Sequence, residues 1–144
     1  MKPEETIDFH IRWAWHRIAR LYNNAASKYG GSMAIGQILL NVEPEGTPST
    51  KLGPKMGMEP RSLTRTLKTM EVEGLIKRVG DESDGRMVRI LLTAKGKKMR
   101  DVSRETVIKF NELVQAEIPE KDLLHFRQVM DKLNELLERK ELLT

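Results

Sequence analysis

Apolar residues recur at every third or fourth position near both ends of the chain, a spacing that predicts long amphipathic helices. The first helix is expected over residues 6–29, and Gly30 and Gly31 end it. Two more are expected near the C-terminus, over about 93–117 and 120–141. A second row of apolar side chains lies beside the main stripe of the first helix. This helix is therefore expected to pack against a second partner as well as against its own core.

Shorter elements are expected in the middle of the chain. Ser32 is a good N-cap for the apolar stretch MAIGQILLN, which predicts a short helix. A turn-rich stretch over 42–50 then leads into a brief helix around 50–57. Pro60 fits the first position of the next helix, and Gly74 closes it.

Two strands are expected after these helices, at residues 76–79 and 87–92, with Asp84-Gly85 as a turn signal between them. Three short helices followed by a hairpin make a winged helix-turn-helix. The fold class is therefore mainly α with a β wing, in one domain of 144 residues. The expected regions are the winged helix-turn-helix over 32–92 and helical dimerisation segments over 1–31 and 93–144.

Positive charge is concentrated in the middle of the chain. Residues 47–104 hold 14 Lys and Arg against 7 Asp and Glu, a formal charge of +7, whereas the remainder holds 11 against 14, or −3. This distribution is typical of a module that binds a polyanion, although composition alone fits a solvated surface with uneven lysines equally well.

The composition also excludes several classes of site and location. The chain has no cysteine, which excludes disulfides, thiolate metal sites and cysteine redox sensing. It has no run of eighteen apolar residues, and its acidic N-terminus lacks the apolar region of a signal peptide. We therefore expect a cytoplasmic protein that makes no membrane contact.

The helix that begins at Pro60 has a basic outer face. Leu63, Leu67 and Met70 form its inward stripe, so at 100° per residue the basic side chains lie opposite. Such a face can donate hydrogen bonds to phosphates and base edges in a major groove, and the alternative is an ordinary solvated helix face. The residues expected to contact DNA here are Arg61, Ser62, Thr64, Arg65 and Lys68.

The turn of the hairpin supplies a second predicted contact. Arg86 follows the turn directly, and an arginine there can enter a narrow minor groove. Asp84 is expected to hold its guanidinium by a bidentate pair, although the Asp-Gly turn alone would also account for Asp84. Possible phosphate contacts are Lys77, Arg78, Arg89, Lys95, Lys97 and Lys98.

Three local motifs in this order resemble the MarR family of bacterial transcriptional regulators. Residues 57–76, from Gly-Met-Glu-Pro to Gly-Leu-Ile, are similar to the family's recognition helix and its exit. Residues 81–86, Asp-Glu-Ser-Asp-Gly-Arg, resemble the wing, where an aspartate stands two positions before an arginine. Residues 92–96, Leu-Thr-Ala-Lys-Gly, resemble the junction into the next helix. The order of elements extends the resemblance over nearly the whole chain.

The resemblance implies an obligate homodimer with interleaved terminal helices that binds a palindromic site in double-stranded DNA. It also implies a transcriptional regulator, expected to be a repressor, that a small anionic aromatic effector can release from DNA. Two residues depart from the family pattern. Glu59 occupies the cap position where Ser, Thr or Asp is usual, and Pro54 is atypical in the preceding helix.

An effector pocket is expected on the first helix, where aromatic side chains and cations lie close together. Such a set suits an anionic aromatic molecule, although packing of the first helix in a dimer core is the favoured explanation of the tryptophans. The candidate residues are Trp13, Trp15, His16, Arg17 and Arg20.

Two other classes of function have weaker support. A winged helix that binds protein instead of DNA is the alternative, and it would present an acidic or apolar outer helix face where this one is basic. An enzyme is not expected, because the chain has no Gly-rich phosphate loop and no His-Glu-x-x-His motif. No metal or cofactor is expected either, since His10 and His16 are six positions apart and do not share a helix face.

Overall fold

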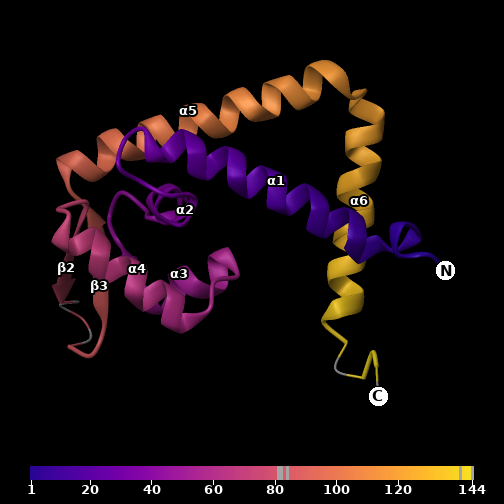
Figure 1. The fold of residues 1–144 in the computed structure, drawn as a ribbon. Coiled ribbons are helices and arrows are strands. Elements are labelled where there is room, and N and C mark those ends of the chain that lie inside the picture. The colour runs from indigo at the N-terminus through magenta and orange to yellow at the C-terminus, as the bar shows by residue number, and fades with distance from the viewer. Residues whose placement is uncertain (81–82, 84, 140, 144) are drawn as a thin grey trace. The chain divides into compact units, whose positions relative to one another are not determined.

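The computed structural model describes residues 1–80, 83, 85–139 and 141–143. The chain divides into two compact units, Met1–Thr106 and Val107–Thr144, and one helix crosses the boundary. The elements are η1 (Pro3–Glu5), α1 (Ile7–Ser27), α2 (Met33–Asn41), β1 (Thr47–Pro48), α3 (Ser49–Met56), α4 (Pro60–Val72), β2 (Ile76–Gly80), β3 (Val88–Leu92), α5 (Ala94–Glu117) and α6 (Glu120–Leu137) (Figure 1). All six predicted helices are confirmed. The last one is shorter than expected and ends at Leu137.

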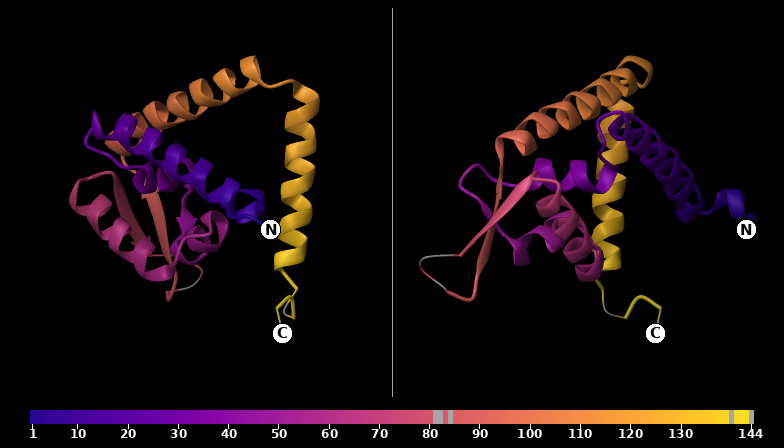
Figure 2. Two further views of the ribbon diagram at one scale, coloured as in Figure 1. Left: turned by 45° about the vertical axis from the view of Figure 1, so that its right-hand side comes forward. Right: turned by 60° about the vertical axis from the view of Figure 1, so that its left-hand side comes forward.

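A three-stranded antiparallel sheet in the order β1-β3-β2 forms the wing and its base. The predicted hairpin is confirmed, with Ile76 opposite Leu92 and Gly80 opposite Val88. It projects from the neighbouring helices, as Figure 2 shows. The sequence analysis missed β1, because two residues in a turn-rich stretch carry no strand signal. Thr47 is extended only because it lies opposite Ile90.

The hydrophobic core lies within the winged helix. Its buried members come from α2, α3, α4, the sheet and the segments that join them, and methionines at its edge pack against it. Within the described residues, α1 and α6 contain no buried side chain, and α5 contributes only Gly96. The core residues are Ile35, Ile38, Leu39, Val42, Leu52, Leu63, Leu67, Met70, Leu75, Ile76 and Ile90.

Local signals place the helices around this core as expected. The Ser32 side chain accepts a hydrogen bond of 3.2 Å from the Ile35 N–H and so caps α2. Helix α3 ends after two turns at Gly57, whose φ of 62° is left-handed and favours glycine. Glu59 makes no side-chain cap hydrogen bond at the start of α4, as its type predicts. Pro54 is the sixth residue of α3, past the first turn, and the helix ends two residues later at Met56, so it is short as the proline predicts.

The junction between the wing and α5 explains the Leu-Thr-Ala-Lys-Gly motif. The Thr93 hydroxyl accepts a hydrogen bond of 3.0 Å from the Gly96 N–H and donates one of 2.6 Å to the Gly74 carbonyl. A Cβ atom at Gly96 would overlap the Leu75 carbonyl oxygen and lie 3.1 Å from its carbon. The motif therefore consists of a threonine cap and a glycine that allows two backbone segments to approach closely.

None of the described helices is both long enough and apolar enough to span a bilayer.

Candidate nucleic-acid interface

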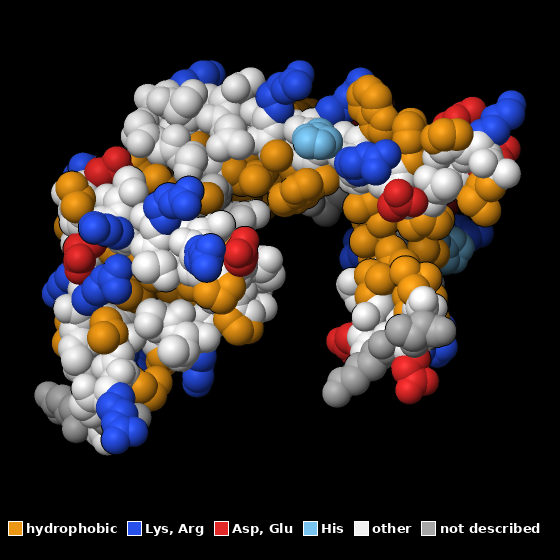
Figure 3. Space-filling model, turned by 60° about the horizontal axis from the view of Figure 1, so that its bottom comes forward, with side chains coloured by type: hydrophobic (Ala, Val, Ile, Leu, Met, Phe, Trp, Pro, Cys, Tyr) orange, Lys and Arg blue, Asp and Glu red, His pale blue; other side chains and the backbone are white. Residues whose placement is uncertain are grey.

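Helix α4 presents a basic face on the side away from the core. Leu63, Leu67 and Met70 are buried, and the residues predicted to contact DNA on this helix are all exposed. In Figure 3, Lys and Arg side chains gather over the winged helix. The predicted division of this helix into an inward and an outward stripe is thus confirmed. The exposed residues are Arg61, Ser62, Thr64, Arg65 and Lys68.

Two threonines of α4 use their hydroxyl protons within the helix and so cannot donate a hydrogen bond to DNA as expected. The hydroxyl of Thr64 donates to the carbonyl of Pro60 at 2.9 Å, and that of Thr69 donates to Arg65 at 3.2 Å. Since a hydroxyl has one proton, these threonines can accept a hydrogen bond from a ligand but have no proton left to donate. The arginines and Lys68 are therefore the principal outward donors of this face.

The wing adds an exposed arginine to this surface. Arg86 is exposed on the turn that follows β2 and precedes β3, as the sequence predicted. The proposed partner of Arg86, Asp84, lies outside the described residues. Arg86 and the basic face of α4 belong to the same compact unit.

The predicted phosphate contacts separate into two groups. Arg89 donates to the carbonyls of Glu45 and Gly46 at 3.2 and 3.1 Å, which holds the loop before β1 against β3. Lys95 donates to the carbonyl of Glu73 at 2.9 Å, at the end of α4. Both residues thus have structural roles. Lys77, Lys97 and Lys98 are exposed and make no contact of this kind within the part of the chain that the structure describes.

Arg78 lies beside the basic face and is oriented by a carboxylate. Its guanidinium is 3.4 Å from the Glu71 carboxylate of α4, and both side chains are partly exposed. Arg78 also lines the groove between α3 and α4. The sequence analysis did not identify Glu71 as its partner, because the pair joins a helix to a strand and no spacing rule links them.

Residues 39–88 match the model of the MarR family, and this stretch contains α3, α4 and β2. The HTH-type transcriptional regulator TtmR of Methylorubrum extorquens (strain PA1) is 29% identical over 93 residues, which is 64% of this chain and 48% of TtmR. The chain is therefore similar to the MarR family over residues 39–88. It spans about half the length of this curated relative.

Solved structures of MarR-type proteins have the same fold. A complex of S. aureus MepR with DNA superimposes with a TM-score of 0.83 at 16% identity, covering 90% of this chain and 97% of MepR. The PcaV regulator of Streptomyces coelicolor, bound to its natural ligand, gives a TM-score of 0.82 at 18% identity, covering 96% of this chain and 98% of PcaV. At these identities the likeness establishes a MarR-type winged-helix fold.

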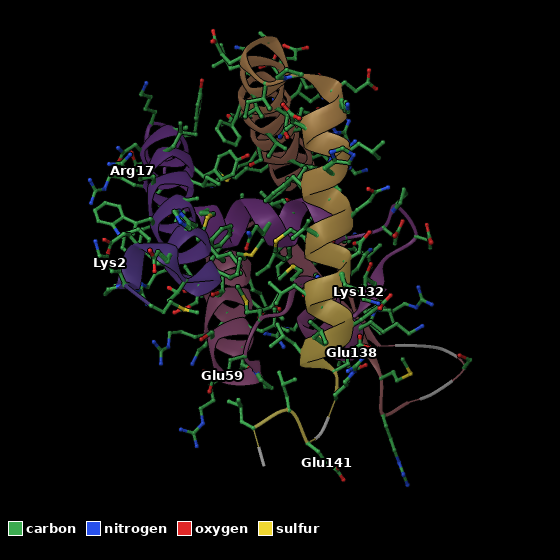
Figure 4. All side chains as sticks on the ribbon, turned by 90° about the vertical axis from the view of Figure 1, so that its right-hand side faces the viewer. Lys2, Arg17, Glu59, Lys132, Glu138 and Glu141 are labelled. Carbon is green, nitrogen blue, oxygen red and sulfur yellow. The ribbon has the colours of Figure 1, made fainter. Side chains whose placement is uncertain are left out.

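A second candidate site lies on α1. Four of the five residues predicted for an effector pocket, together with Arg12, line a depression of about 330 Å³. The Arg17 guanidinium lies 5.2 Å from the Trp13 ring centroid, a cation–π distance, and Figure 4 shows Arg17 projecting outward from α1. Trp15 does not line the depression. The sequence analysis missed Arg12, although Arg12, His16 and Arg20 repeat every four positions on one helix face.

The electrostatics of α1 favour an anion. Arg12 is 3.8 Å from Asp8, a pair of exposed side chains that neutralises it only weakly. Burial raises the pKa of the Tyr22 phenol, so this tyrosine adds no negative charge to the helix at neutral pH. Among the described residues no group of three or more His, Asp or Glu side chains is arranged to hold a metal ion.

Proposed function

We propose that this chain is a homodimeric repressor that binds a palindromic operator in double-stranded DNA. The observation that carries the proposal is the basic outer face of α4 next to Arg86 of the wing, inside the segment that matches the MarR model. A helix with such a face fits the major groove, and an arginine on the neighbouring hairpin fits the minor groove beside it. The MepR complex with DNA supports the same use of the fold.

The dimer is inferred from apolar side chains that neither compact unit covers. In a monomer, exposed side chains as large as these on so many helical turns would remain in contact with water. A two-fold dimer would cover them and would also present two copies of α4 to successive major grooves, about 34–36 Å apart. The exposed residues on the terminal helices are Ile7, Ile11, Trp13, Trp15 and Leu21 on α1, Ile108 and Leu113 on α5, and Leu124, Phe126, Val129 and Leu137 on α6.

A salt titration of DNA binding tests this function. We expect the purified protein to bind a fragment of its own upstream region with a steep dependence on salt, because each phosphate contact contributes about −0.9 to the slope of log K against log [salt]. Arg86→Ala is expected to weaken binding and leave helical content and the dimer unchanged. Lys132→Ala is the matched control, since Lys132 lies on α6 outside the winged helix (Figure 4).

Three outcomes would contradict the proposal. A flat salt dependence would refute binding through phosphates. Loss of the dimer in Arg86→Ala, measured by sedimentation, would mean that this residue belongs to the subunit interface. Failure to bind any upstream fragment would favour the alternative, a winged helix that binds a protein partner.

We further propose that an anionic aromatic molecule binds the depression on α1 and lowers the affinity for DNA. Three arginines supply positive charge, and the Trp13 ring supplies an aromatic wall. The PcaV structure with its natural ligand supports the use of this fold for ligand binding.

The two tryptophans of the chain allow a direct test of this site. Both are about half exposed and lie two positions apart on α1, but only Trp13 lines the depression. In Trp15→Phe the remaining reporter is Trp13, and benzoate is expected to change its fluorescence in a saturable manner. In Trp13→Phe the remaining reporter is Trp15, and we expect no saturable change. Equal responses of the two variants would place the ligand elsewhere.

A further inference from the structure

Helices α3 and α4 enclose a groove of about 570 Å³ on the surface of the winged helix. Apolar side chains make up much of its lining, including Pro54 from α3 and Met58 from the turn that follows. Helix α4 contributes Pro60, Leu63 and Thr64. The groove therefore places an apolar surface directly beside the basic residues of α4.

Thr64 is one of the residues that line this groove, and its side chain carries a methyl group as well as a hydroxyl. The Thr64 hydroxyl already donates to the Pro60 carbonyl at 2.9 Å, so it has no proton left for a base edge. Thr64 is exposed and lies in the first two turns of α4, the part of a recognition helix that contacts base edges. Its methyl group is thus available for an apolar contact where base recognition is expected.

One base offers an apolar group in the major groove. Thymine carries a 5-methyl group there, and a threonine methyl is a suitable partner for it. The positive charges of Arg61, Arg65 and Lys68, which are exposed on the same helix, favour DNA over an uncharged ligand. Arg78, which also lines the groove and is held by Glu71, is placed to bind a phosphate beside the same base.

We propose that the groove between α3 and α4 receives the 5-methyl group of a thymine in each operator half-site, and that Thr64 determines this preference. The proposal rests on the proposed function, because it requires binding to DNA. Transfer of one methyl group from water to an apolar surface corresponds to about a fourfold change in Kd.

The test replaces single thymines by deoxyuridine, which lacks only the methyl group. The duplex is one that the wild-type dimer selects from a random-sequence pool, and Kd is measured by fluorescence anisotropy. Each half-site is expected to contain one thymine that responds. Replacement of that single thymine by deoxyuridine, in one half-site at a time, should weaken binding about fourfold. Replacement of the other thymines should have little effect.

Variants of Thr64 identify the protein side of this contact in a double-mutant cycle. Thr64→Ser keeps the hydroxyl and removes the methyl group, so it is expected to bind the thymine and deoxyuridine duplexes equally. Thr64→Val keeps a methyl group in the same place and is expected to retain the discrimination. Thr69→Ser is the matched control, because Thr69 is exposed and bonded to its own helix in the same way but does not line the groove.

The outcomes separate this inference from the proposed function. If the wild-type protein selects a duplex and no thymine responds to deoxyuridine, the inference is overturned and DNA binding stands. Discrimination that persists in Thr64→Ser would assign the methyl contact to another residue and overturn the role of Thr64. If no duplex is enriched from the pool, the proposed function itself fails, and the inference fails with it.

Discussion

Replacement of Gly96 by alanine tests whether the junction between α4, the wing and α5 depends on the close approach of two backbones. The added Cβ atom would overlap the carbonyl oxygen of Leu75. Leu75 cannot move away easily, because its side chain is buried and its N–H donates to the Met70 carbonyl at 2.9 Å. Its carbonyl accepts a hydrogen bond of 3.1 Å from the Thr93 N–H, so displacement also breaks a contact to the start of α5.

The expected loss of stability follows from three contributions. Insertion of a methyl group into a closely packed site costs about 1–3 kcal/mol. Loss of one or two of the hydrogen bonds around Leu75 and Thr93 costs about 1 kcal/mol each. Alanine is favoured over glycine in a helix by about 1 kcal/mol, which offsets part of this cost. These contributions sum to about 1–4 kcal/mol, so we expect Gly96→Ala to lower the free energy of unfolding by about 2–3 kcal/mol, the middle of that range.

Urea and thermal unfolding followed by circular dichroism at 222 nm measure this loss. Both proteins must be compared at one concentration, because subunit association makes the midpoint depend on concentration. A decrease of about 2–3 kcal/mol corresponds to a melting temperature lower by roughly 5–10 °C in a chain of this size. Gly80→Ala is the matched control, since none of the described residues has an atom within 4 Å of a Cβ atom there. Equal stability of Gly96→Ala and the wild type would refute the steric reasoning.

Three further substitutions test the core, the cap and the role of an arginine. Leu52→Ala removes a fully buried side chain and should lower the free energy of unfolding by about 2–5 kcal/mol, whereas Val72→Ala, at a side chain that is 82% exposed, should change it by less than about 0.5 kcal/mol in the same urea titration. Thr93→Ala should cost about 1–2 kcal/mol by loss of its two hydrogen bonds, and a smaller loss in Thr93→Ser would confirm that the hydroxyl is responsible. Arg89→Ala should reduce stability but leave the salt slope of DNA binding unchanged, and a slope smaller by about 0.9 would instead show a phosphate contact.

Sequence reasoning placed the helices well because their signals are local. The apolar period of α4, Pro60 at its start and Gly74 after its end all act within a few residues of one another. The outward position of Arg61 and Arg65 follows from the same period. No comparable signal marks β1, because Thr47 becomes a strand residue only through its pairing with the distant Ile90.

Roles that depend on a distant backbone atom could not be predicted in this way. Arg89 and Lys95 are residue types that commonly bind phosphates. In this fold, however, their charged groups donate to backbone carbonyls, which lie 43 and 44 residues away for Arg89 and 22 residues away for Lys95. Thr64 has a hydroxyl that could donate a hydrogen bond to DNA, yet that hydroxyl donates its proton to a carbonyl of its own helix. In each case the type of side chain limits the groups that it can bind, and the backbone carbonyls around it determine which group it binds in the folded protein.

The amino-acid sequence by itself therefore determined the order of the helices, the hairpin, the basic face of α4 and the resemblance to the MarR family. These features depend on periodicity, capping and charge, which act over short distances along the chain. Only the tertiary structure decided that an apolar groove lies beside Thr64 and that Gly96 must lack a side chain. The groove depends on how α3 packs on α4, and the close approach at Gly96 depends on how the start of α5 packs on Leu75. Packing of that kind leaves no local pattern in the sequence.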